Sequence, residues 1–524
     1  MSSIELTEYP TATKAKTPAK MGTDGGAPEP LDRPISTEDE DQLEAVVTHD
    51  EGKVIDPVFG DIAEGNRYRD MGWLPASILM MKTQIGIGAL SVPQSFNTLG
   101  LIPGIIALTG FAIITTWSNW MIGKFKAKHP EVYGVEDVGR LLFGRAGREL
   151  FQGAYLLYYI FVGGSAFISV ATGLDALCDH AVCNSLLIAI AAIAGFLLCS
   201  TETLSKLSWI AWCGIVAILI SIFTLAVSVA VQNRPAAAPQ TGPWSSDWKL
   251  VGDPTFPQAM SAIAAIIFSY SGTAAFFPIA AEMKDQRKYF KAMYLCQAVV
   301  YIVYLVIGVV VYYYCGSYVA SPALGSAGPL LKKICYGIAL PGLLVTTAIL
   351  PAKSLFVRFM RNNEHFTART RTHWIVWLSC TFSVIIIGYV IASAIPVFNG
   401  LVSLIGALLG TPICITAYGA MWLYDNWELR KSEERGRFWI AGVAWACFII
   451  VLGFYCMIAG TYGAVRDVED LYSSSKFKAW VEEELRRGGS PAGSANPKAY
   501  AAAPKAREKE HTREALCNAL TTKI

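Results

Sequence analysis

Charge is scarce in this sequence: Asp, Glu, Lys and Arg make up 16% of its 524 residues, whereas 53% of the residues are hydrophobic. The apolar residues fall in long blocks, which is typical of a chain that crosses a membrane several times and not of a soluble globular protein. The net charge is +2, and the charges lie mainly in tails and loops that flank the blocks. This distribution gives no indication of nucleic-acid binding.

Motifs for several kinds of chemistry are absent as well. The 12 cysteines are scattered, with no CxxC pair and no metal-ligand spacing, so we expect neither a metal nor another cofactor. The sequence contains no GxxxxGK[ST] phosphate loop and no HExxH pair, and its apolar blocks hold no cluster of His, Cys and carboxylate residues. We therefore predict that the protein is not an enzyme, an ATP-driven pump or a membrane protease.

Eleven apolar blocks are long enough to cross a bilayer. Lys and Arg are concentrated in the connections after the even-numbered blocks, for example at Lys126, Arg140 and Arg148. The positive-inside rule therefore places these connections and the N-terminus in the cytoplasm. The blocks cover residues 73–99, 101–124, 150–177, 184–201, 207–231, 257–282, 292–315, 327–357, 373–394, 397–424 and 438–462.

The blocks divide the chain into three regions. Residues 1–71 carry 16 Asp and Glu against 7 Lys and Arg and predict a disordered acidic cytoplasmic tail. Residues 72–462 form the predicted transmembrane transporter domain, and residues 463–524 a polar, mostly disordered C-terminal tail. An odd number of crossings puts that tail outside the cell, although it carries 11 Lys and Arg against 9 Asp and Glu. A missed or re-entrant span is therefore an open alternative.

The first block contains residues that interrupt a regular helix. Its segment "MMKTQIGIGALSVPQSF" (80–96) has Gly86 and Gly88 near the middle and Pro93 five residues after Gly88. Unwound backbone in lipid leaves N–H and C=O groups without partners, which is costly unless they line a wet cavity or bind a ligand. The break therefore indicates a ligand site, with close helix packing or a simple kink as the alternative.

The sixth block repeats this pattern. In "IIFSYSGTAAFFPIAAEM" (266–283), Gly272 lies among hydroxyl residues and Pro278 follows six residues later. The first and sixth blocks would each head a unit of five helices, with the eleventh as an addition. We predict an all-α polytopic membrane protein with 11 transmembrane helices, a 5+5 inverted repeat and broken helices 1 and 6.

The two breaks together indicate the ligand. Backbone N–H groups near Gly86 and Gly88 would bind a carboxylate. The last carbonyls of the first half of the first block, and those freed around Ser269 to Ser271 in the sixth, would bind an ammonium group, so we predict an α-amino acid. Small uncharged residues line the breaks, and they favour a neutral side chain because desolvating an unpaired charge is costly. The candidate substrate-binding residues are Ile85, Gly86, Gly88, Ala89, Ser269, Tyr270, Ser271, Gly272, Thr273, Tyr159, Gly163 and Thr346.

Some of these candidates have a simpler structural interpretation. Tyr159 and Gly163 share one helix face and would line the cavity, but an aromatic residue packed on lipid or a neighbouring helix gives the same pattern. Tyr270 is predicted to form a lid over the ligand. Thr346 would supply a hydroxyl to the site, or bond back to its own helix.

Two charged residues lie at the edges of the breaks. Lys82 stands one turn before the glycines, and we interpret it as the group that couples transport to protons. The alternatives are a lysine that caps carbonyls of the broken helix or extends its amine to the cytoplasmic surface. Glu282, at the end of the sixth block, either closes an intracellular gate or lies among lipid headgroups.

The segment "KTQIGIGALSVPQSFNTLGLIPGI" (82–105) resembles the opening of the amino acid/auxin permease family. The longer "MGWLPASILMMKTQIGIGALSVPQSFNTLG" is similar to the fungal branch with the neutral amino acid permease of the methyltryptophan-resistance type. The resemblance covers roughly residues 70–462 and implies a fold like that of the sodium-coupled leucine transporter, with alternating access.

The same resemblance implies proton-coupled symport, with a neutral amino acid, protons and the lipid bilayer as partners and no nucleic acid. We expect the plasma membrane rather than the vacuolar membrane. The resemblance does not fix the substrate. A transporter of an amino-acid-derived metabolite such as an alkaloid and a non-transporting amino acid sensor are the alternatives.

Overall fold

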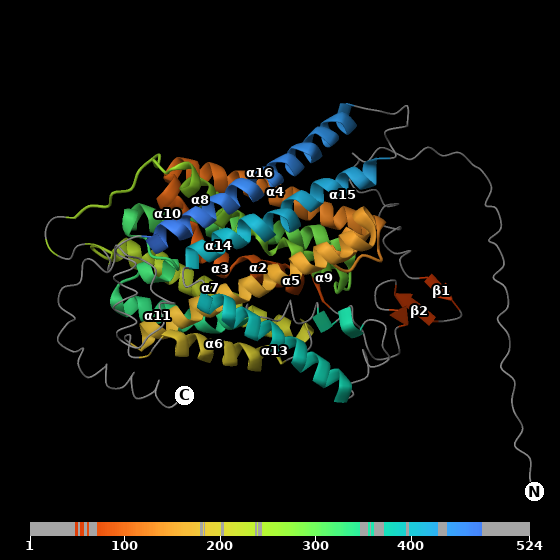
Figure 1. Cartoon of the computed structure of the whole chain (residues 1–524), viewed down its shortest axis with the longest axis horizontal. Coiled ribbons are helices and arrows are strands. Elements are labelled where there is room, and N and C mark those ends of the chain that lie inside the picture. Colours follow the sequence, from red (N-terminus) through yellow and green to blue (C-terminus); the bar gives the residue numbers. More distant parts are fainter. Residues whose placement is uncertain are drawn as a thin grey trace, which may run out of the picture.

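The computed structural model describes residues 71–178, 182, 184–200, 204–235, 238, 241, 244–345, 355, 356, 358–360, 371–394, 398–427 and 437–473, and three strands between residues 48 and 61. Most of this part of the chain forms long helices that run close to the long axis of the molecule (Figure 1). The first half contains α2 (Trp73–Gln84), α3 (Ile87–Leu99), α4 (Leu101–Lys128), α5 (Val135–Leu177), α6 (Asn184–Cys199), α7 (Leu204–Val231), α8 (Phe256–Tyr270), η1 (Ser271–Ala275) and α9 (Phe276–Ala281).

The second half of the chain continues the bundle. It contains η2 (Gln286–Lys288), α10 (Tyr289–Cys315), η3 (Gly316–Tyr318), η4 (Ala323–Ser326), α11 (Pro329–Val345), α13 (Arg371–Ala394), α14 (Phe398–Ile405), η6 (Gly406–Gly410), η7 (Pro412–Thr416), α15 (Ala417–Asn426) and α16 (Arg437–Ser473). The segments η6 and η7 are π-helical, a rare geometry that is often found at functional sites.

Eight of the described helices are long and apolar enough to cross a membrane. The first predicted span is divided into α2 and α3, and the fourth and eighth correspond to the shorter helices α6 and α11. The chain is therefore an all-α, multi-pass membrane protein with a broken first and a broken sixth span, as predicted. The number of eleven crossings stays a prediction.

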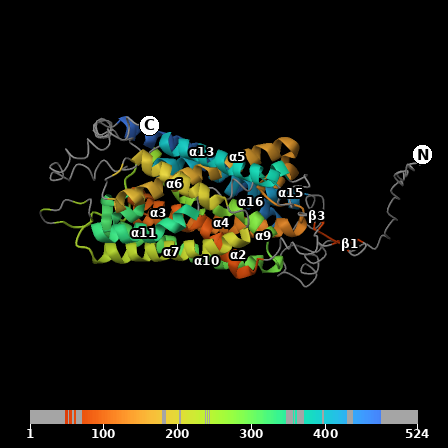
Figure 2. The same cartoon turned by 90° about the horizontal axis from the view of Figure 1, so that it is seen from below.

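The broken helices occupy the middle of the bundle. In the most apolar window of the sixth span, 94% of the residues are buried against other parts of the protein, compared with 22% in α16. In Figure 1, α16 lies along one side of the bundle and α6 and α13 along the other. Figure 2 shows α7 and α10 on the side away from α13. A helix covered on all sides can keep broken backbone away from lipid, which the edge helices cannot.

Three local features differ from the sequence expectations. The strands β1 (Thr48–Asp50), β2 (Lys53–Asp56) and β3 (Gly60–Asp61) form an antiparallel sheet in order β1-β2-β3, for which the prediction of a disordered tail made no provision. The helix α16 runs to Ser473, past the predicted end of the last span at residue 462. Helix α5 begins at Val135 and changes direction at Gly144, where φ is 68°, before the predicted third span.

Candidate functional site

The first break separates α2 from α3 by two residues, Ile85 and Gly86. Ile85 has an extended conformation with ψ at 108°, and its N–H still donates to Met81 O at 2.6 Å, which ends the first half-helix. The first N–H groups of α3, at residues 87–89, have no acceptor within that helix, and no described side chain accepts a hydrogen bond from them. A helix N-terminus with unpaired donors favours an anion.

The second break follows α8, where the chain continues as the 3-10 turn η1. Its carbonyls have donors from three other elements. The Tyr304 hydroxyl of α10 lies 2.7 Å from Ser269 O, and the Cys414 thiol of η7 donates to Ser271 O at 2.9 Å. The Gln84 amide of α2 approaches Tyr270 O at 3.5 Å. The carbonyls of this break that were expected to bind an ammonium group are thus already paired with side chains in this conformation.

The two breaks contact each other directly. The Ser269 hydroxyl lies 3.0 Å from Gly88 O, which also accepts a hydrogen bond from Ser91 at 2.8 Å. A Cβ atom added to Gly88 would lie 2.8 Å from Ser269 Cα, and one added to Gly272 would overlap the Thr83 carbonyl. Glycine at these two positions therefore permits the close approach of α3 to α8 and of η1 to α2.

The candidate residues of the two breaks are buried in this conformation. Tyr270 does not cover an open cavity: its ring packs against the Tyr304 ring with the centroids 5.3 Å apart. Tyr159 and Gly163 of α5 are buried too, and Tyr159 interacts with Cys414 and Tyr418. Thr346 lies outside the described residues.

Lys82 lies in the last turn of α2, and only 4% of its surface is exposed. Its ammonium nitrogen has no hydrogen-bond acceptor among the described residues. The side chain therefore neither caps a described carbonyl nor extends its amine to the surface in this conformation. The helix dipole favours a positive charge at this end of α2, although Met81 O and Gln84 O already accept hydrogen bonds.

The predicted cytoplasmic end of the site is closed by hydrogen bonds between distant segments. Met71, just before α2, accepts a bond from Lys284 N at 2.9 Å and donates to Glu282 O at 3.3 Å. The Tyr133 hydroxyl, in the connection after α4, donates to the Glu282 carboxylate at 3.3 Å. These contacts join Glu282 to the segment before α2 and to the connection after α4, an arrangement that a gate residue would have.

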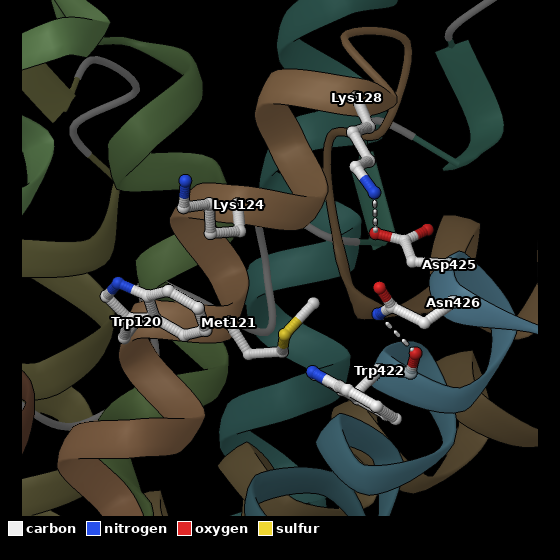
Figure 3. A pocket seen from close by; sticks show the side chains of 7 residues that line it. All are labelled: Trp120, Met121, Lys124, Lys128, Trp422, Asp425 and Asn426. Atoms are coloured by element: carbon white, nitrogen blue, oxygen red, sulfur yellow. Dashed lines mark hydrogen bonds and ion pairs between the residues drawn. The ribbon is translucent and has the colours of Figure 1, made fainter. Parts of the chain in front are cut away.

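A small pocket lies at this same end, between α4 and α15, and it shares no residue with the candidate site (Figure 3). One oxygen of the buried Asp425 carboxylate lies 3.0 Å from His129 Nε2, and the other lies 4.0 Å from the Lys128 ammonium nitrogen. The pocket is lined by Trp120, Met121, Lys124, Lys128, Trp422, Asp425 and Asn426. The ion pairs join the end of the second span to the tenth.

Sequence reasoning missed the side chains that hold the breaks together. Tyr304 lies 2.8 Å from Gln84 O and 2.7 Å from Ser269 O, so one hydroxyl bridges both breaks. Gln84 and Ser91 carried a weak signal, because each is a polar residue in an apolar block within three residues of a glycine. Tyr304 carried none, since its block contains several tyrosines, and Cys414 carried none because a single cysteine in an apolar block is usually a packing residue.

Two broken spans that meet at the centre of a multi-pass helical bundle define a membrane transporter. The chain belongs to the transmembrane amino acid transporter family, whose sequence profile matches residues 69–466. This is the amino acid/auxin permease family that the sequence resembled, and it consists of transporters and not of enzymes. The protein is accordingly a secondary transporter for amino acids in a membrane.

Two fungal relatives agree with this assignment. A "Transmembrane transporter" of Gibberella moniliformis is 31% identical over 420 residues, covering 80% of this chain and 88% of the relative. The "N amino acid transport system protein" of Neurospora crassa is 30% identical over 416 residues, covering 78% and 87%. Among solved structures, a Na+-coupled sialic acid symporter gives a TM-score of 0.47 at 12% identity, covering 76% of this chain and 92% of the symporter.

Proposed function

We propose that the protein takes up neutral amino acids by alternating access, coupled to protons. The unpaired N–H groups at residues 87–89 carry this proposal, because they suit the α-carboxylate that all amino acids share. Substrate specificity then depends on the side chain, and the break residues Ala89, Ser269, Ser271, Gly272 and Thr273 contain no charge to pair with a charged one.

Lys82 is the proposed coupling residue. It is the buried ionisable group nearest to the first break in sequence, and it has no described hydrogen-bond acceptor that would fix its charge. A buried amine that gains and loses a proton between the two faces of the membrane would link proton flux to the position of α2. The sodium-coupled alternative makes Lys82 a structural residue only.

The proposal is tested by uptake in a host that lacks its own amino acid transporters. Radiolabelled leucine should accumulate in cells that express the protein, and a proton-gradient uncoupler should abolish the accumulation. Leucine, phenylalanine and tryptophan should compete for uptake, whereas lysine and glutamate at equal concentration should not. Strong inhibition by lysine or glutamate would overturn the neutral specificity. Failure of every amino acid to compete would favour an amino-acid-derived metabolite, and binding without accumulation a sensor.

A substitution at Lys82 separates coupling from binding. Lys82→Met keeps the length of the side chain and removes its charge, so we expect exchange of labelled for unlabelled leucine to persist while accumulation driven by an acidic exterior is lost. Lys249→Met, in the connection before α8, is the matched control and should retain both activities. Accumulation by Lys82→Met at the wild-type level, with unchanged pH dependence, would contradict the coupling role.

The membrane of residence is part of the proposal. Uptake from the medium requires the plasma membrane, so a fluorescent fusion expressed at native level should label the cell outline and not the vacuolar rim. A vacuolar signal would reassign the direction of physiological transport without affecting the substrate.

A further inference from the structure

Three buried hydroxyl side chains from different elements meet beside the second break. They are Tyr159 of α5, Thr273 of η1 and Tyr418 of α15, and their exposed fractions are 6%, 0% and 0%. None of the three hydroxyl groups completes a hydrogen bond with a described residue. Tyr159 has Tyr155 as a neighbour and Tyr418 has Thr273, but none of these contacts is a complete hydrogen bond, so the three hydroxyls keep hydrogen-bonding capacity for a ligand or a water.

The contacts define the cluster as one site. The Tyr418 hydroxyl approaches the Thr273 side chain and the Cys414 thiol, without a completed hydrogen bond to Thr273. Tyr159 lies close to both Cys414 and Tyr418. The Cys414 thiol donates to Ser271 O and so ties the cluster to the broken part of the sixth span.

The surroundings limit the chemistry that fits. Phe277 stacks on the Tyr418 ring with the planes at 17° and the centroids 6.4 Å apart, which makes one wall apolar. Among the described residues, the groups that interact with Tyr159 and Tyr418 are tyrosine, threonine and cysteine side chains, and the Glu136 carboxylate acts on the adjoining Tyr155. Metal cations prefer carboxylate and carbonyl ligands, and a charged ligand would lack a counter-ion among these tyrosine, threonine and cysteine side chains. A hydroxyl both donates and accepts, so the group that fits is uncharged and does the same.

We propose that Tyr159, Thr273 and Tyr418 form a subsite for the polar side chain of the transported amino acid. The inference rests on the proposed function: the α-carboxylate binds at the start of α3, and the side chain extends past η1 to the three hydroxyls. Neutral amino acids with a side-chain hydroxyl or carboxamide then bind more tightly than apolar amino acids of the same shape. Leucine and its like remain substrates, because the hydroxyls can bind water instead.

The experiment compares isosteric competitors. Threonine against valine and asparagine against leucine differ in hydrogen-bonding atoms but hardly in volume, and each is tested as an inhibitor of labelled alanine uptake. In the wild type, we expect the polar member of each pair to inhibit about tenfold more strongly. Tyr418→Phe and Thr273→Val each remove one hydroxyl and should reduce this preference by about threefold to tenfold.

The control is Tyr294→Phe, which removes a hydroxyl from an exposed tyrosine of α10 and should leave both ratios unchanged. Membrane abundance is measured for every variant with a fluorescent tag. If one variant fails to reach the membrane, the inhibition ratios of the other variant test the subsite, because its hydroxyl belongs to a different span. If both variants fail, the inhibition ratios of the wild type are the test.

Three results would overturn the subsite: equal inhibition within each pair in the wild type, unchanged ratios in both variants, or a uniform loss of affinity for polar and apolar competitors. Absence of any amino acid uptake in the wild type would instead refute the proposed function. The two failures are therefore distinguishable in the same set of assays.

Discussion

The two broken spans differ in which backbone groups they leave without partners. At the first break, the N–H groups of residues 87–89 have no acceptor within α3 and none among the described side chains. At the second, the carbonyls of Ser269, Tyr270 and Ser271 are all within reach of side-chain donors. Similar interruptions by glycine and proline therefore have different results: the first leaves N–H donors at the start of α3, where we propose that a ligand binds, and the second supplies acceptors that fasten neighbouring helices.

This difference has an electrostatic basis. Carbonyls in the second break can be paired by neutral hydroxyl, amide and thiol groups, which the protein has in plenty. N–H groups converging at one helix end carry partial positive charge, and a protein would need a carboxylate to satisfy them. No described carboxylate is placed there, so the first break stays open to an anion that arrives from outside.

Among changes at the two breaks, a side chain added at Gly88 should have the largest effect on uptake. We expect Gly88→Val to abolish uptake, because its Cβ would lie 2.8 Å from Ser269 Cα and its branches would cover the N–H groups of α3. Gly110→Val in α4 is the matched control, since a Cβ atom there meets nothing within 4 Å. Uptake and membrane abundance are measured together. Wild-type uptake by Gly88→Val would show that the ligand binds elsewhere.

Removing the hydroxyl that bridges the breaks should have the next largest effect. Tyr304→Phe removes the single hydroxyl proton that the buried carbonyls of Gln84 and Ser269 share, at a cost of about 1–3 kcal/mol. We expect a lower thermal midpoint of the detergent-purified protein and uptake reduced by about tenfold. The exposed Tyr294→Phe should change neither quantity. An unchanged midpoint in Tyr304→Phe would mean that the bridge does not hold the breaks together.

The positions of the two breaks were predictable from the sequence, but the hydrogen bonds that hold the breaks together were not. Gly86, Gly88 and Gly272 stand out because glycine, proline and hydroxyl residues are conspicuous in an apolar block. The contact of Tyr304 with Gln84 joins residues 220 positions apart. Helical periodicity predicts which face of a span is buried, but it does not predict which other span packs against that face. The end of α16 was misjudged for a related reason. Hydropathy marks the end of the apolar block at residue 462, but the helix continues through polar residues to Ser473.

The last prediction concerns the small contact where the two breaks meet, and it has the smallest expected effect. Gly88 O accepts from both Ser91 and Ser269, whose hydroxyl oxygens are 3.3 Å apart. Because a carbonyl keeps a donor when either hydroxyl is lost, Ser91→Ala should cost only about 0.5–1 kcal/mol and change uptake by less than about threefold.

The double variant tests whether the two serines act as alternatives. With both Ser91→Ala and Ser269→Ala, Gly88 O loses every side-chain donor, and the loss of stability should exceed the sum of the single losses. Thermal midpoints of the wild type, both single variants and the double variant complete the cycle. Additive losses would show that each serine is bound independently, with Ser269 serving mainly Ala265 O, from which it is 2.9 Å distant. The first break would then be fastened to the second by Tyr304 alone among these hydroxyls, and the ligand end of α3 would be freer to move than the paired carbonyls of the sixth span.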